Sequence, residues 1–126
     1  MAYNQIIYLV IQYSEGSDNP LNAQMLKGLL EGCILQVIRG KETYGYRICE
    51  DLAGGGFTDV NEGTVYPILI RLEKRGFIRG TRIESPLGPM RKYYTLTPAG
   101  ENYLASFYES WEETSQAVNR FLKGGS

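Results

Sequence analysis

Three short helical patterns, each ended by glycine, occupy residues 21–76 and limit the possible folds more than any other feature. The first covers residues 21–39, where apolar side chains recur with the i, i+3, i+4, i+7 spacing of an amphipathic helix before Gly40. The second begins at Thr43, a suitable N-cap, and continues to about Ala53. Its predicted apolar side consists of Tyr46, Ile48, Cys49 and Leu52.

A third helix is predicted to begin after Asn61, another good N-cap, and to end at Gly76. Pro67 lies inside this helix and removes the hydrogen bond to the carbonyl of Gly63, which bends the first turns. One side of the helix carries Val65, Ile68, Leu69 and Leu72. The opposite side carries Gly63, Pro67, Ile70, Arg71 and Lys74.

Two strands and a long helix follow. The strands are predicted at 77–84 and 90–96, and the turn residues Ser-Pro-Leu-Gly-Pro between them indicate a hairpin. Thr97 then caps a last helix that runs to about Lys123, with Pro98 at its first position. The predicted fold is mainly α with a small β-hairpin (α+β), which is the order of a winged helix-turn-helix.

The chain divides into three predicted parts. Residues 21–97 form the winged helix-turn-helix domain, and residues 98–126 form a C-terminal dimerisation helix. Residues 1–20 are an N-terminal extension of uncertain structure, whose apolar stretch 3–13 fits a strand or a short buried helix. The extension is either a native element or a cloning remnant.

Charge is distributed unevenly along the chain. The formal net charge of −1 argues by itself against nucleic-acid binding, but residues 71–92 contain only Glu73 and Glu84 as acids. The bases of this segment are Arg71, Lys74, Arg75, Arg79, Arg82, Arg91 and Lys92. Such a cluster indicates a polyanion-binding face, and the alternative is a solvated helix and hairpin.

Several classes of function are excluded by residue type. The sequence has no histidine, which rules out imidazole metal ligands and Ser-His or Cys-His catalysis. Cys33 and Cys49 lie on apolar faces, so we expect buried free thiols and not a disulfide or zinc site. No nucleophile–base pair or metal-ligand set is visible, so we expect a protein that is not an enzyme and has no cofactor or metal.

No membrane association is expected. The apolar run Ile6–Ile11 is far too short to span a bilayer, and no basic segment precedes it as in a signal peptide. A cytoplasmic location is the resulting expectation.

The third helix is the right width for the major groove of double-stranded DNA. Asn61 and Thr64 near its N-terminus, with Arg71 and Lys74 further along, are the predicted contacts. The hairpin would lie along the flanking backbone as a wing, through Arg79, Arg82, Arg91 and Lys92. The alternative is a winged-helix adaptor that binds proteins without direct DNA readout.

The last helix carries an apolar seam. Leu104, Tyr108, Trp111, Ser115, Val118 and Leu122 follow the 4-3-4-3-4 spacing of a coiled coil. A helix of about 26 residues is roughly 39 Å long, more than one small domain needs for its own core. We therefore predict a homodimer with Leu104, Tyr108, Trp111, Val118 and Leu122 in its interface. The alternative is that the helix folds back on the first helix of its own subunit.

Residues 21–97 resemble the PadR family of transcriptional regulators. Four stretches carry the resemblance: LKGLLEGCIL at 26–35, TYGYRI at 43–48, NEGTVYPILIRLEKRG at 61–76 and RKYYTLT at 91–97. The resemblance implies a repressor that binds a palindromic operator as a dimer. It also implies DNA contacts from Asn61, Thr64, Tyr66, Arg71, Gly88, Arg91 and Lys92. Tyr44 and Tyr46 are interpreted as core or helix-contact residues, and Tyr93 and Tyr94 as packing residues of the hairpin.

The stretch Tyr108–Trp111 is similar to the short, multidrug-binding branch of the family. That similarity implies that Trp111 stacks on a planar aromatic compound between the monomers, with Phe107, Gly32 and Ser115 as neighbours. Ser115 departs from the branch, where an acidic residue can help to hold cationic drugs, and Glu112 is not at the matching position. Two alternatives stay open: Trp111 as simple interface core, and a regulator controlled by its own abundance instead of by a ligand.

Overall fold

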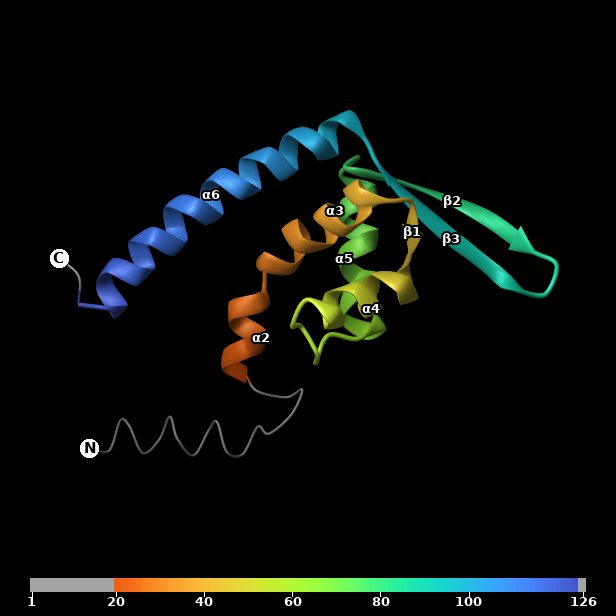
Figure 1. The fold of residues 1–126 in the computed structure, drawn as a ribbon. Helices are drawn as coiled ribbons and strands as arrows, with labels where there is room; N and C mark the ends of the chain where they lie inside the picture. The colour runs from red at the N-terminus through yellow and green to blue at the C-terminus, as the bar shows by residue number, and fades with distance from the viewer. Residues whose placement is uncertain (1–19, 125–126) are drawn as a thin grey trace.

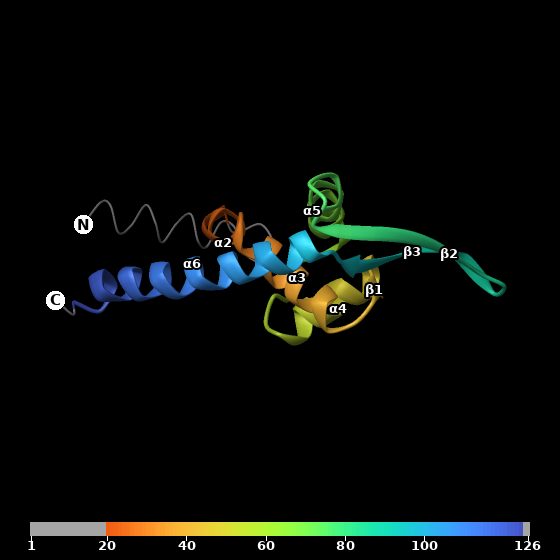
Figure 2. The same ribbon diagram turned by 90° about the horizontal axis from the view of Figure 1, so that it is seen from above.

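The computed structural model describes residues 20–124, so the predicted extension at 1–20 lies almost entirely outside the described residues. Three helices, α3, α4 and α5, pack in the centre of the molecule (Figure 1). The β2–β3 hairpin projects from one end of this body and α6 from the other (Figure 2). The elements are α2 Pro20–Leu26, α3 Leu29–Gly40, β1 Thr43–Tyr44, α4 Gly45–Gly54, α5 Glu62–Lys74, β2 Ile78–Ser85, β3 Gly88–Leu96 and α6 Pro98–Leu122.

The single helix predicted over residues 21–39 is wrong, because the structure divides it into α2 and α3. Gly28, between the two helices, has a φ of 97°. A residue in this left-handed region cannot continue a right-handed helix, and glycine adopts the conformation without a steric penalty. The apolar periodicity continues across the break, which is why the pattern does not reveal it.

The predicted N-cap role of Thr43 is also wrong. Thr43 and Tyr44 form the short strand β1, which pairs antiparallel with β3 opposite Tyr94 and Tyr93. Helix α4 therefore begins two residues later than predicted, at Gly45. The predicted hairpin is present as β2 and β3, and β1 extends it to a three-stranded sheet of order β1-β3-β2.

The core lies between α3, α4, α5 and the sheet. Its most deeply buried side chains are Ile34, Leu35, Ile48, Val65, Leu69 and Leu72. The buried stripe predicted for the third helix is confirmed in α5. Tyr46 is 56% exposed, so its predicted place in the core is wrong. It lies in the first turn of α4, on the side turned away from the core.

The two cysteines are free and half-buried, so the prediction of free thiols is confirmed and that of full burial is not. Burial raises the pKa of both thiols above the usual value, and the charge of Glu62 adds to the effect at Cys49. Within residues 20–124 no cluster of three or more cysteine, aspartate or glutamate side chains is placed to hold a metal ion.

Helix α6 begins as predicted. The hydroxyl of Thr97 accepts a hydrogen bond from the amide of Gly100 at 3.0 Å and donates one to the carbonyl of Gly76 at 2.6 Å. Only the first turns of α6 pack against the body, and most later side chains are exposed. Among the helices of the described chain, none combines the length and apolarity needed to cross a membrane.

Candidate nucleic-acid interface

Helix α5 begins at a side-chain cap. The Oδ1 of Asn61 accepts a hydrogen bond from the amide of Thr64 at 3.2 Å, which satisfies one of the free N–H groups at the helix start. The helix continues through Pro67 without a break. Gly63 has no side chain to crowd the proline ring and is exposed. On the outer side of the first turns of α5, Gly63 and Pro67 therefore add no long side chain.

The two flanks of α5 face different parts of the protein. On one flank, Thr64 and Arg71 border a cavity of about 600 Å³ that α2, the start of α3 and the loop before α5 complete. On the other flank, Tyr66 faces the hairpin, which we call the wing. Between the flanks, opposite the buried stripe, the exposed residues are Gly63, Pro67, Ile70 and Lys74.

Arg71 is held by an acidic side chain of its own subunit. Its Nη2 lies 3.4 Å from the Oε2 of Glu31 on α3. The Oε1 of Glu31 is 3.6 Å from Nη1 of Arg75 and accepts a hydrogen bond from the hydroxyl of Tyr103 at 3.0 Å. The Glu31 side chain is only 13% exposed. We call these four residues the Glu31 junction, because they join α3, α5 and α6.

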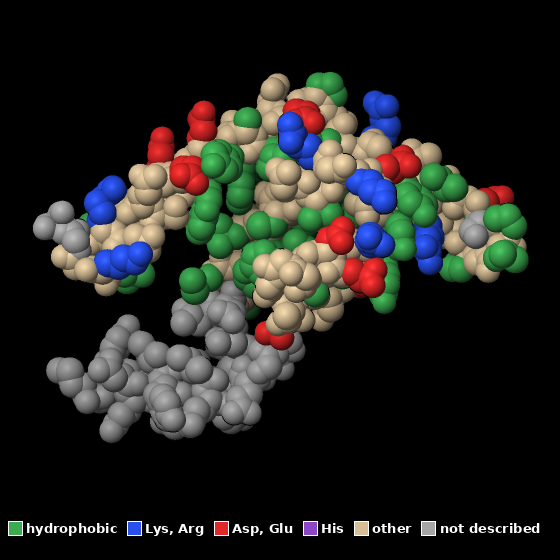
Figure 3. Space-filling model, viewed as in Figure 1, with side chains coloured by type: hydrophobic (Ala, Val, Ile, Leu, Met, Phe, Trp, Pro, Cys, Tyr) green, Lys and Arg blue, Asp and Glu red, His purple; other side chains and the backbone are tan. Residues whose placement is uncertain are grey.

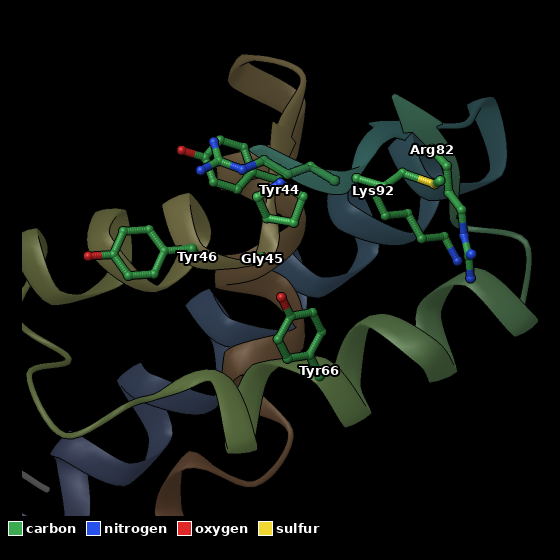
Figure 4. Close-up of a pocket in the computed structure, with 9 residues that line it drawn as sticks. Tyr44, Gly45, Tyr46, Tyr66, Arg82 and Lys92 are labelled. Atoms are coloured by element: carbon green, nitrogen blue, oxygen red, sulfur yellow. The ribbon is translucent and has the colours of Figure 1, made fainter. Parts of the chain in front are cut away.

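A cleft of about 390 Å³ separates the wing from the helices and is drawn in Figure 4. It is lined by Tyr44, Gly45, Tyr46, Tyr66, Arg82, Pro89, Met90, Arg91 and Lys92, and we call it the wing cleft. The hydroxyl of Tyr66 points toward Gly45, where a Cβ would come within 2.8 Å of the ring. Burial, and secondly the charge of Glu62, raises the pKa of Tyr66, so the hydroxyl stays protonated and can donate a hydrogen bond.

The cations of the wing cleft differ in how they are held. Lys92 Nζ is 2.7 Å from Oε1 of Glu73, whereas Arg91 stacks on Tyr44 with 4.4 Å from its guanidinium carbon to the ring centroid. Arg79 and Arg82 form no ion pair within residues 20–124. Arg79, Arg82 and Arg91 are the wing cations with no acidic partner to displace before they contact phosphate.

A helix-turn-helix with a cationic wing is the arrangement of a DNA-binding regulator, and comparison with known proteins identifies the family. The model of the transcriptional regulator PadR-like family matches residues 34–106. The chain belongs to the PadR-like family of transcriptional regulators. This family consists of DNA-binding winged-helix proteins, not enzymes.

Solved structures agree with this assignment. A PadR-like transcriptional regulator from Bacillus cereus is 49% identical, with 79% of this chain and 96% of that chain covered and a TM-score of 0.70. A PadR family regulator from Eggerthella lenta is 25% identical over 97% of this chain and 96% of its own, with a TM-score of 0.75. An uncharacterised protein from Lysinibacillus sphaericus is 29% identical over 106 residues, which are 82% of this chain and 97% of that protein.

The structure distributes the predicted DNA contacts of this PadR-like chain over separate places. Tyr66, Arg91 and Lys92 meet at the wing cleft, and Lys74 lies on the outer side of α5. Gly88 lies at the far end of the wing, where it pairs with Ser85. Asn61 and Arg71 are engaged in contacts within the protein.

Sequence reasoning missed several residues that border the wing cleft. Tyr44, Gly45 and Tyr46 were not predicted as site residues, and Arg82 was predicted only as a cation of the hairpin. The signal was weak, because β1 is only two residues long and a strand of that length leaves no alternation in the sequence.

A third hollow lies between α3, α4 and α6 of the PadR-like fold and has a volume of about 790 Å³. The ring of Phe107 from α6 packs directly onto Gly32 of α3 in this groove. Hydrophobic side chains also gather on the concave side of α6 in Figure 3. Trp111 is further along α6 and 44% exposed, and Ser115 Oγ donates to the carbonyl of Glu112 at 3.3 Å.

Leu104 differs from the other residues predicted for the dimer interface. It is 9% exposed and belongs to the hydrophobic core of its own subunit. Tyr108, Trp111, Val118 and Leu122 are exposed in the single chain. The first turns of α6 thus follow the alternative of folding back on the same subunit, and the free part of the seam begins at Tyr108.

Proposed function

We propose that this chain is a homodimeric repressor that binds a palindromic operator in double-stranded DNA. One α5 enters the major groove at each half-site, and the wing follows the flanking backbone. The observation that carries the proposal is the position of two surfaces at opposite ends of the molecule (Figure 2). Unpaired arginines lie at the wing, and an exposed apolar helix extends from the other end.

The dimer is supported by the exposed part of α6. The helix has 25 residues, roughly 37 Å at the rise of an α-helix, and its second half extends beyond the body. Large apolar side chains remain exposed there, up to 86% for Phe121. A contiguous exposed apolar stripe of this kind is typical of an interface between proteins. A second copy of the same helix is the simplest partner with matching spacing.

Two substitutions of equal charge test the dimer. Val118→Asp places a carboxylate on the seam, whereas Gln116→Asp places one on the opposite side of α6. We expect Val118→Asp to sediment as a monomer at micromolar concentration and Gln116→Asp to remain a dimer. A wild-type protein that sediments as a monomer would contradict the proposal.

Selection from random duplex DNA at several salt concentrations tests the operator. We expect an inverted repeat whose half-site centres are one helical turn apart, about 34–36 Å or a multiple of it. The affinity should fall steeply with salt, because cations of the wing displace counterions from phosphate. An absence of salt-dependent binding would favour the winged-helix adaptor, the competing function.

We further propose that a planar aromatic compound enters the groove beside α6 and changes the spacing of the two α5 helices. Gly32 and Phe107 line this groove, and Trp111 and Ser115 lie beyond it on α6. Trp111 is the sole tryptophan of the chain, so its fluorescence reports binding. We expect acridine dyes both to quench the Trp111 fluorescence and to weaken operator binding.

A matched pair of neutral and cationic dyes tests whether the serine at position 115 abolishes a preference for cations. Equal affinity for both dyes is expected, because the acids that line the groove, Asp51, Glu101 and Glu109, are exposed to solvent, as is Glu112 on the turn before Ser115. If no dye quenches the fluorescence or alters operator affinity, the chain is a regulator controlled by its abundance.

A further inference from the structure

The outer side of α5 carries few groups that can form hydrogen bonds with bases. At 100° per residue, Gly63, Pro67, Ile70 and Lys74 lie opposite the buried stripe, and all four are exposed. The side chains of Pro67 and Ile70 contain only carbon and hydrogen, and Gly63 has no side chain. Ile70 is the large group among them and is 64% exposed. Lys74 is the last residue of the helix.

Asn61 and Arg71, two polar residues beside this surface, already have partners within the protein. A bidentate pair with adenine needs both the oxygen and the nitrogen of an asparagine amide, and the Oδ1 of Asn61 accepts the Thr64 amide. A bidentate pair with guanine needs a free guanidinium, and Arg71 is held by Glu31. The Asn61 oxygen and the Arg71 Nη2 therefore each have a contact within the protein that a bidentate pair with a purine would have to share or replace.

The major groove offers one apolar group to a reading helix, the 5-methyl group of thymine. We propose that Ile70 reads thymine methyl groups by apolar contact and is the main specificity residue of α5. Gly63 and Pro67 add no long side chain, which lets the helix approach the bases closely. The inference rests on the proposed function, since it requires α5 in the major groove. The arginines of the wing supply attraction to DNA that does not depend on sequence.

Deoxyuridine is the probe, because it pairs as thymine does and lacks only the methyl group. Each thymine of the selected operator is replaced in turn, and affinity is measured by fluorescence anisotropy at fixed salt. We expect at least one position per half-site where the wild-type protein binds about fourfold more weakly, the effect of losing one buried methyl group. The Ile70→Ala variant should bind the thymine and uracil duplexes equally.

Ile83→Ala is the matched control, because Ile83 is also an exposed isoleucine but lies on β2 of the wing. This variant should keep the thymine preference. Ile70 is exposed and outside the core, so Ile70→Ala is expected to fold, and its urea midpoint verifies this.

Two results would overturn the inference and leave the proposed function intact: operator binding that is indifferent to every thymine methyl, or a preference that persists in Ile70→Ala. A protein without salt-dependent affinity for any duplex would refute the proposed function itself, and the role of Ile70 with it.

Discussion

Gly32 is the residue on which the contact between α3 and α6 depends. The ring of Phe107 occupies the space that a Cβ at this position would take. The glycine is inside a helix, where its backbone freedom is a cost, so its value lies in the close approach of the two elements. The same approach forms one wall of the groove beside α6.

Gly32→Ala should lower the free energy of unfolding by about 1–3 kcal/mol, because Phe107 must leave a well-packed position. Gly54→Ala is the control, since Gly54 is also helical and has no heavy atom within 4 Å of an added Cβ. That variant should be unchanged or more stable by up to about 1 kcal/mol. Urea unfolding compares them, and equal stability of the two variants would show that Phe107 is free to move.

Arg91 stacks on Tyr44, and within the described residues it has no carboxylate partner that phosphate would have to replace. Arg91→Ala should therefore weaken binding to all duplexes alike and reduce the slope of log K against log salt by about 1. Arg120→Ala removes the same charge from α6, far from the wing, and should leave the slope unchanged. If both variants keep the wild-type slope, the wing does not lie on the DNA backbone.

Helices α3, α5 and α6 are joined by the Glu31 junction more than by any other polar contact of the described chain. Glu31 contacts the guanidinium groups of Arg71 in α5 and of Arg75, the C-cap of α5, and accepts a hydrogen bond from a hydroxyl group of α6. Arg75 also stacks over the rings of Phe77 and Tyr103, with 4.8 and 5.0 Å to their centroids. A shift of α6 against α3 would therefore change the contacts that hold α5.

Glu31→Gln should lower the free energy of unfolding by about 1–2 kcal/mol, because two arginines lose a largely buried acceptor of opposite charge. Glu101→Gln is the control, since its pair with Arg39 has 2.9 Å between Nε and Oε2 but both side chains are half exposed. Such surface pairs contribute about 0–1 kcal/mol. The urea midpoints of the two variants measure this difference in stability. Equal midpoints would show that solvent screens both carboxylates to the same extent.

For the molecule as a whole, stability is expected to fall at alkaline pH. Burial raises the pKa of Cys33 and Cys49 above 9.0 and that of Tyr66 and Tyr94 above 10.0. The unfolded chain therefore ionises first and is favoured as the pH rises. The contribution of these groups is complete below about pH 8 and is lost as the pH rises through the raised pKa values.

Urea unfolding at pH 7 to 11 measures this loss. The free energy of unfolding should be constant up to about pH 8 and then fall. In a variant with Cys33→Ala and Cys49→Ala, only the tyrosines remain, so the fall should begin about one pH unit higher. A fall that begins at the same pH in both proteins would show that the thiols do not contribute.

The order of the elements was predictable because each is encoded within a few neighbouring residues. The stripe Val65, Ile68, Leu69 and Leu72 repeats with the helical period, and Asn61 and Thr97 cap the helices that follow them. The hairpin follows from its turn residues. These signals are local, and the structure confirms them.

Where the sequence was insufficient, the missing information was spatial. The break at Gly28, the strand formed by Thr43 and Tyr44, and the pairing of Arg71 with Glu31 all depend on residues that are distant in sequence or on backbone angles. Periodicity identifies the side of a helix that is buried, but not which flank of α5 faces α3 and which faces the wing. The sequence alone determined a winged helix-turn-helix with a cationic hairpin and a long last helix, since those depend on local pattern and charge. The packing of α3, α5 and α6 decided which cations have an acidic partner, because the ion pair of Arg71 with Glu31 joins residues that are 40 positions apart in the sequence.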